Sequence, residues 1–208
     1  MNNIQKDLSY AEGLANSCKD LQGLELTIRS FDRCLLKNTA NNIVFSDGNP
    51  NADLMLIGEA PGFEEDQSGI PFVGIAGQLL DKMLLAIGQN RNNTYITNMV
   101  FWRPPGNRKP TEEEISLCYP FVKKHIELIN PKILILSGAV AAQSILKSNL
   151  GITRLRGNWS KISFLKNGEY TYIMPIFHPA YLLRSPEKKK ETWEDLKSIK
   201  KKLTSTDI

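Results

Sequence analysis

Residues 54–62 read Leu-Met-Leu-Ile-Gly-Glu-Ala-Pro-Gly, a short run of aliphatic side chains that leads directly into a glycine-containing turn. An apolar run of this length, bounded by turn residues, is typical of a β-strand that is buried on both faces. Similar runs recur at residues 95–101, 133–136 and 172–177. We therefore expect four buried strands in one sheet.

The stretches between these runs carry apolar residues at helical spacing, at about residues 75–87, 112–129, 139–147 and 187–203. The second stretch follows Thr111-x-x-Glu114, the pattern of a capping box at a helix start. Strands that alternate with helices predict a parallel sheet with helices on both faces and ligand groups at the carboxyl ends of its strands. The expected fold class is α/β, a three-layer α/β/α arrangement around a central four-stranded parallel sheet.

The first 33 residues are expected to form a helical N-terminal segment packed on this sheet. Apolar residues from Leu8 to Leu21 keep helical spacing, and Gly23 is expected to separate that helix from a second one ending near Arg33. Residues 34–203 would then form the α/β core. A length of 208 residues fits one domain, residues 1–208.

Composition excludes several classes of protein. Hydrophobic residues make up 41% and charged residues 23%, values of ordinary globular chains that argue against disorder, collagen and coiled coils. The run 133–136 is far too short to span a membrane, and the polar N-terminus does not resemble a signal peptide. Three widely spaced cysteines argue against a disulfide framework and favour a cytoplasmic location, with association at the nucleoid if the ligand is DNA.

The net charge of +4 is compatible with an anionic partner but does not demonstrate one. Six acids and no base lie between Asp47 and Asp66, whereas residues 103–109 and 154–166 carry bases and no acid. We interpret these acidic and basic segments as parts of one site. The many lysines of residues 184–203 are typical of a solvated helix face.

Polar residues follow three of the expected strands. Gly58 begins a long loop whose glycines would let the backbone approach a ligand, although it lacks a nucleotide-phosphate or dinucleotide motif and a purely structural turn is the alternative. Asn98 ends the second strand, where its amide would suit the edge of a base or, alternatively, cap a loop. His178 follows the fourth strand. His125, beside Lys123 and Lys124 in a helix, is expected at the surface.

Taken together, these segments resemble the uracil-DNA glycosylase superfamily, most closely its family 4, known from bacteria and archaea. The resemblance covers roughly residues 31–200, with the motifs in family order. The matching stretches are GEAPG at 58–62, EED at 64–66, G-x-PFVG-x-AGQLLD at 69–81, YITN at 95–98, RPPGNR at 103–108 and HPAYLLR at 178–184.

The resemblance implies roles for the residues that hold the base. Phe72 would stack on a flipped uracil, Asn98 would bind its O4 and N3 edge, and His178 would lie near O2. Backbone groups around Gly58, Glu59 and Ala60 would help to hold the ring.

The resemblance also leaves one catalytic role open. In the best-known branches of the superfamily an Asp activates water where this chain has Ala60. The nearest replacements are Glu59 and Glu65, with Asp66 as a weaker candidate.

DNA contacts follow from the same resemblance. The RPPGNR loop, with Arg103, Asn107 and Arg108, and the strand end at Ser137 would contact phosphates. Leu182 or Leu183 would wedge into the gap left by the extruded nucleotide, and Arg184 would add a further cation facing the backbone.

The chain departs from the family in its cysteines. Family 4 proteins usually bind a [4Fe–4S] cluster through four cysteines, but the corresponding positions here are Phe31, Cys34, Trp102 and Cys118. Aromatic rings cannot coordinate iron, so we expect no cluster and no other metal, and we expect the two rings to fill its volume. The alternative is that Cys18 supplies a third ligand.

The function expected from the sequence is that of a DNA repair glycosylase that flips uracil out of DNA and hydrolyses its N-glycosidic bond, leaving an abasic site. Two alternatives remain open: a glycosylase for another deaminated base, hypoxanthine or xanthine, and a non-catalytic module that binds damaged or single-stranded DNA. The expected partner is uracil-containing DNA, with no membrane involvement, and the protein is expected to be a monomer.

Overall fold

The computed structural model describes residues 3–164 and 169–205. Over these residues the chain forms a six-stranded sheet with the order β1-β3-β2-β4-β6-β5. The four inner strands are parallel: β3 (Thr94–Asn98), β2 (Leu54–Gly58), β4 (Ile133–Ser137) and β6 (Thr171–Ile176). The two edge strands are antiparallel to their neighbours: β1 (Asp47–Gly48) and β5 (Ser160–Ile162).

The α/β fold class is confirmed, but the expected number of strands is wrong. The four inner strands correspond to the four apolar runs, and β3 ends at Asn98 as expected, before the apolar run itself ends at residue 101. The edge strands β1 and β5 span 2 and 3 residues, and neither is fully buried. Such short strands carry no apolar run of their own, because they form by pairing with a neighbour already in the sheet.

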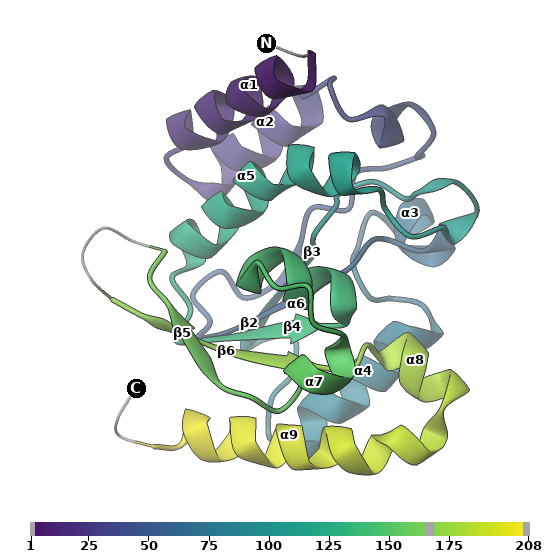
Figure 1. Cartoon of the computed structure of the whole chain (residues 1–208), viewed down its shortest axis with the longest axis vertical. Coiled ribbons are helices and arrows are strands. Elements are labelled where there is room, and N and C mark those ends of the chain that lie inside the picture. The colour runs from purple at the N-terminus through teal and green to yellow at the C-terminus, as the bar shows by residue number, and fades with distance from the viewer. Residues whose placement is uncertain (1–2, 165–168, 206–208) are drawn as a thin grey trace.

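Helices cover both faces of the sheet, as expected for three layers (Figure 1). One face, which includes Met55 and Ile57, packs beneath α1 (Asn3–Ser17), α2 (Leu21–Ser30), α5 (Glu112–Ile129) and α6 (Ala139–Leu146). The other face, which includes Leu54 and Leu56, packs against α4 (Ile75–Ala86), α8 (Pro179–Arg184) and α9 (Lys189–Leu203). The remaining short helices are α3 (Phe63–Ser68), α7 (Ile152–Leu155), η1 (Leu35–Asn38), η2 (Pro105–Asn107) and η3 (Pro186–Lys188).

The N-terminal helices pack against α5, and the break between them is not at Gly23. Helix α1 ends at Ser17, and the side chain of Asp20 accepts a hydrogen bond of 2.7 Å from the backbone N–H of Gly23. Asp20 is therefore the N-cap of α2, and Gly23 lies inside that helix. The carboxylate cap outweighs the low helix propensity of one glycine.

The inward face of α5 carries His125, which was expected at the surface. Its side chain is fully buried against the rings of Phe45, Tyr95 and Phe101, with centroid distances of 4.4, 5.8 and 5.7 Å. Burial lowers the pKa of His125 to about 3, and within the described residues neither ring nitrogen has a hydrogen-bond partner. His125 is thus a neutral part of the core.

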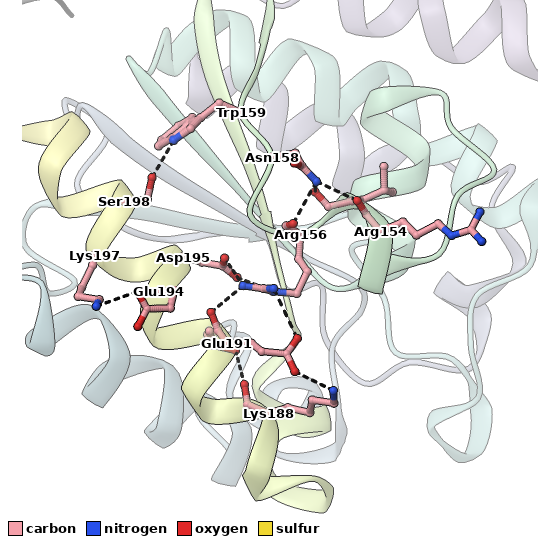
Figure 2. A network of polar contacts seen from close by, with 12 residues as sticks. Arg154, Arg156, Asn158, Trp159, Lys188, Glu191, Glu194, Asp195, Lys197 and Ser198 are labelled. Carbon is pink, nitrogen blue, oxygen red and sulfur yellow. Dashed lines mark hydrogen bonds and ion pairs between the residues drawn. The ribbon is translucent and has the colours of Figure 1, made fainter.

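Helix α9 is amphipathic and is fastened to the segment after α7 by Arg156 (Figure 2). The Arg156 guanidinium forms an ion pair with the buried carboxylate of Asp195 and donates to the backbone oxygen of Glu191 at 2.6 Å. It also lies over the ring of Phe177, 5.4 Å from its centroid.

The bases of residues 154–166 were expected to share a site with the acids of residues 47–66. For Arg156 this expectation is wrong, because its side chain is a structural tie to α9. Lys166, another base of that stretch, lies outside the described residues. Within residues 3–164 and 169–205, no helix has the length and hydropathy needed to cross a bilayer.

Candidate active site

A cavity of about 470 Å³ opens where β2, β3 and β6 end at their carboxyl edges. Three loops converge on it because parallel strands bring their ends to one edge of the sheet. Most of the expected site residues line it: Glu59, Ala60, Glu65, Phe72, Asn98, Asn107, Arg108, His178 and Arg184. Gly58, Arg103, Ser137, Leu182 and Leu183 are not among the lining residues.

Gly58 forms a point of close approach between two of these side chains. A Cβ atom at this position would lie 2.4 Å from Oδ1 of Asn98 and 2.5 Å from Cζ of Phe72. Any larger residue would therefore displace the amide or the ring. Gly58 and Asn98 are paired in the register of β2 and β3, so the sheet itself sets their separation.

Phe72 and His178 form one wall of the cavity. Their ring centroids are 5.6 Å apart with an interplanar angle of 28°, a stacked arrangement. The backbone of Phe72 has a φ of 56°, the left-handed region that a bulky side chain rarely adopts. A ring held in this way offers a flat apolar surface to a planar ligand.

His178 is the N-cap of α8, and this contact fixes which nitrogen carries its proton. Its Nδ1 accepts a hydrogen bond of 3.2 Å from the backbone N–H of Ala180. Burial, with a further contribution from Arg184, lowers the pKa of His178 to about 4, so the ring is neutral at pH 7. The proton therefore resides on Nε2, which makes that atom a neutral hydrogen-bond donor.

Asn98 is 2% exposed at the end of β3. Among the described residues no hydrogen bond forms to its side-chain amide, so its acceptor and its donors are both available to a ligand in the cavity. A neutral amide can match a base edge that presents a donor beside an acceptor.

The acids of the loop after β2 have different environments. Glu59 is partly buried in the cavity wall, and burial raises the pKa of its carboxyl, although Lys109 lowers it. Glu65 accepts hydrogen bonds from the backbone N–H groups of Gly62, Val73 and Gly74, at 3.0, 2.9 and 2.9 Å. Its oxygens thus fasten the two ends of the loop that carries Phe72.

Asp66 is 1% exposed and also has a structural environment. It accepts hydrogen bonds from the backbone N–H of Asn41 at 2.8 Å and from its side-chain amide at 2.6 Å. Among the three candidate acids, Glu59 is therefore the one whose carboxylate forms no hydrogen bond to the backbone of the described residues.

The basic residues near the cavity are not equivalent. Arg108 forms two hydrogen bonds to the carboxylate of Glu114, at 2.6 and 2.8 Å, so its charge is partly neutralised. Arg103 instead donates to the amide oxygen of Asn107 at 2.7 Å and lies 5.1 Å from the centroid of the Phe63 ring.

Three candidates for DNA contact differ in exposure. The side chain of Ser137 is fully buried, and within the described residues its hydroxyl has no hydrogen-bond partner. Leu182 is 1% exposed and belongs to the core beneath α8, whereas Leu183 is 41% exposed. The leucine available to a ligand on this side is therefore Leu183.

Two residues near the site were not identified from the sequence. Phe63, the first residue of α3, lines the cavity and is 52% exposed. Arg91, in the loop before β3, donates to the backbone oxygens of Pro71 and Phe72. Neither belongs to a residue pattern with a known chemistry, so only their spatial neighbours identify them.

The residues at the cluster positions of family 4 do not fit a cluster that needs four thiolates. Phe31, Cys34, Trp102 and Cys118 are all buried in one hydrophobic cluster. A hydrogen bond between the two thiols lowers the pKa of Cys34 and raises that of Cys118.

The rest of this region is occupied by aromatic and thiol contacts. Phe31 packs edge-on against Phe121 with ring centroids 5.0 Å apart. Cys18 donates to the backbone oxygen of Leu14 and contacts Thr27, both at 3.3 Å, within the α1–α2 pair. Among the described residues, no group of three or more His, Cys, Asp or Glu side chains could hold a metal ion.

The chain matches one family model and is similar to several uracil-DNA glycosylases. The family model described as the uracil DNA glycosylase superfamily matches residues 45–197. The chain is 39% identical to a type-4 uracil-DNA glycosylase of Thermotoga maritima, over 83% of this chain and 89% of the relative. It is 37% identical to one of Archaeoglobus fulgidus, over 87% and 92%. It is 38% identical to one of Saccharolobus solfataricus, over 87% and 85%.

Proposed function

The chain belongs to the uracil-DNA glycosylase superfamily and hydrolyses the N-glycosyl bond of uracil in DNA, and we propose that the cavity at the strand ends is where this reaction takes place. The observation that carries the proposal is that Phe72, Asn98 and His178 line one cavity, where Phe72 meets Asn98 at Gly58 and stacks on His178. A base inside a duplex is inaccessible, so the nucleotide must be extruded into this cavity before its sugar carbon can be attacked.

The base is held by stacking and by one amide. Uracil stacks on Phe72, the N3–H of uracil donates to Oδ1 of Asn98, and the Nδ2 group of Asn98 donates to O4. Cytosine presents an acceptor at N3 and an amino group at N4. The same amide would then place acceptor against acceptor and donor against donor. The backbone of Gly58 and Ala60 completes the base site.

The departing uracil is stabilised by His178. As the glycosidic bond breaks, negative charge develops on the uracil ring, and the Nε2–H of His178 donates to O2. Because the pKa of His178 is lowered to about 4, the stabilisation comes from a neutral hydrogen bond rather than from an imidazolium charge.

Glu59 is the acid assigned to the sugar and the attacking water. The breaking bond leaves positive charge on the sugar, and a carboxylate beside it lowers the free energy of the transition state. We assign Glu65 instead to positioning, because three backbone N–H groups already occupy its oxygens.

DNA is held outside the cavity by Arg103, Asn107 and Arg184, with Phe63 beside Arg103 at the entrance. Arg108 contributes less because Glu114 binds its guanidinium. Leu183 is the residue that enters the space left by the extruded nucleotide, since Leu182 belongs to the core.

We further propose that the protein functions without an iron–sulfur cluster and as a single domain and a monomer. Two thiolates are too few for the cluster of family 4, and Phe31 and Trp102 occupy the other two positions. Measured iron in the purified protein should be far below one equivalent, and stoichiometric iron with visible absorbance would contradict this.

A strand-cleavage assay tests the proposed site. Oligonucleotides containing uracil, hypoxanthine or xanthine are incubated with the protein and treated with alkali, which breaks the strand at abasic sites. We expect breaks at uracil, strongly reduced in Glu59→Gln at an unchanged unfolding midpoint. Glu65→Gln should lower the unfolding midpoint as well as the rate. Binding of uracil DNA without any strand break would contradict the enzymatic function, and a Glu59→Gln variant of parental rate would contradict the assigned role.

A further inference from the structure

Arg91 lies outside the cavity wall but forms hydrogen bonds to the turn that carries Phe72. Its Nη1 donates to the backbone oxygen of Pro71 at 3.0 Å, and its Nη2 donates to the backbone oxygen of Phe72. One guanidinium therefore binds two consecutive carbonyls through two different nitrogens, which its planar fork of donors holds in a fixed geometry.

Two carboxylates fix the direction of this guanidinium. Nη1 of Arg91 lies 2.6 Å from Oδ2 of Asp47 in β1, and its Nε lies 2.9 Å from Oδ1 of Asp81 in α4. The Arg91 side chain is 25% exposed, so these contacts are only partly screened by solvent. The Arg91 side chain thus links β1 and α4 to the Pro71–Phe72 turn.

The turn needs such support because Phe72 has a φ of 56°. Left-handed backbone is unfavourable for a bulky residue and persists only where its surroundings enforce it. Two glycines leave room for Phe72 in this conformation. A Cβ at Gly77 would lie 1.7 Å from the backbone oxygen of Phe72, and a Cβ at Gly58 would lie 2.5 Å from its ring. The glycines permit the conformation, whereas the hydrogen bonds of Arg91 favour it.

We infer that Arg91 is a positioning residue that holds the backbone of Phe72 in the left-handed conformation and so places its ring for stacking with uracil. The inference rests on the proposed role of Phe72 in the base site. Without the two hydrogen bonds, the turn relaxes towards ordinary φ values, and the ring leaves its place beside Gly58 and His178. The extruded base then loses its stacking surface although every residue that touches it is still present.

Single-turnover cleavage of a uracil oligonucleotide with saturating enzyme tests this inference. Arg91→Gln should reduce the maximal rate by about 10- to 100-fold, the loss typical when a group in contact with substrate is displaced by about 1 Å. Arg91→Lys keeps the charge but not the planar fork, and it should lose most of the same factor. Affinity for DNA that already contains an abasic site should stay at the parental value, because no base is there to stack.

A double-mutant cycle with Phe72→Ala separates positioning from general stabilisation. If Arg91 acts through the ring of Phe72, Arg91→Gln should cost less than about 2-fold in the Phe72→Ala background. The same loss in both backgrounds would overturn the inference, and so would a parental rate for Arg91→Gln. The matched control is Arg29→Gln, which removes an Arg–Glu25 contact of 2.6 Å on the exposed face of α2 and should leave the rate unchanged.

Two further results keep the inference separate from the proposed function. A parental rate for Phe72→Ala would refute the stacking role itself, whatever Arg91 does. If Arg91→Gln does not fold, Asp81→Asn replaces it, because that change removes one of the two carboxylates that fix the guanidinium while leaving Arg91 in place. Asp81→Asn should then show a smaller loss of rate that also disappears in the Phe72→Ala background, and an additive loss would again overturn the inference.

Discussion

At the scale of single residues, Asn98 has the chemistry to distinguish uracil from cytosine. Asn98→Asp should reduce cleavage at uracil and introduce cleavage at cytosine, because a carboxyl accepts from the N4 amino group and, when protonated, donates to N3. The measurement is strand cleavage with matched uracil and cytosine oligonucleotides. The matched control is Asn92→Asp at an exposed position. Parental uracil cleavage in both Asn98→Asp and Asn98→Ala would mean that the base is read elsewhere.

His178 should make a large single contribution to the rate. Removing one pre-placed donor to a developing anion typically costs roughly 10²–10³ in rate, so His178→Ala should lose about that factor in single-turnover cleavage. Binding of uracil DNA should persist, because Phe72 and the basic residues remain. His178→Asn retains an N-cap for α8 and separates loss of the cap from loss of the donor. A parental rate would assign the stabilisation to backbone amides around Gly58.

His125 should make stability depend on pH. Its pKa is lowered to about 3 in the folded protein, whereas an unfolded histidine titrates near 6.5. Below pH 6.5 the unfolded chain therefore binds a proton that the folded chain does not, and the free energy of unfolding falls as pH decreases towards 3. The loss between pH 7 and pH 5 should be about 2 kcal/mol from this residue.

Urea unfolding at pH 7 and pH 5 checks this prediction. His125→Leu should lose about 2 kcal/mol less than the parent over that interval. Part of the dependence should remain in the variant, because the pKa of His178 is also lowered, to about 4. Equal losses in the parent and the variant would contradict the prediction.

At the scale of elements, the attachment of α9 depends on a buried ion pair (Figure 2). Arg156→Met leaves the carboxylate of Asp195, which is 3% exposed, without its cation and should cost about 3–5 kcal/mol. Replacing both residues, Arg156→Met with Asp195→Leu, should recover much of the loss because no unpaired charge remains.

Chemical denaturation measures these differences. The matched control is Lys197→Met, which removes a 2.7 Å ion pair with Glu194 on the exposed face of α9. That change should cost less than about 1 kcal/mol. If Arg156→Met is no more destabilising than Lys197→Met, the tie to α9 is not energetically important.

At the scale of the whole molecule, the basic residues around the cavity should make binding depend on salt. Each cation that faces a phosphate releases a counterion, so Arg103→Ala and Arg184→Ala should each reduce the slope of log K against log salt by about one unit. Arg108→Ala should reduce it less, because Arg108 is already paired with Glu114. Binding titrations at several salt concentrations check this. If all three variants keep the parental slope, the cations that face the phosphates are instead the lysines of α9.

Much of the fold and most of the cavity wall could be predicted from local patterns. Apolar runs bounded by turns predicted the four inner strands, and their alternation with helices predicted that the strands are parallel. Parallel strands end at one edge, so the loop after Gly58, Asn98 and His178 were expected to meet there, and Glu59 of that loop, Asn98 and His178 line one cavity. These features could be read in advance because each depends on spacing along a few consecutive residues.

Other features depend on residues that are distant in the sequence and meet only in the folded chain. The edge strands form through their neighbours in the sheet, and His125 is buried because three aromatic residues from other segments surround it. The hydrogen bonds of Glu65 to backbone N–H groups and those of Arg91 to the Phe72 turn likewise form only in the tertiary structure. Periodicity along the chain reports which face of an element is apolar, but the partner of a buried polar group is set by the packing of the whole molecule.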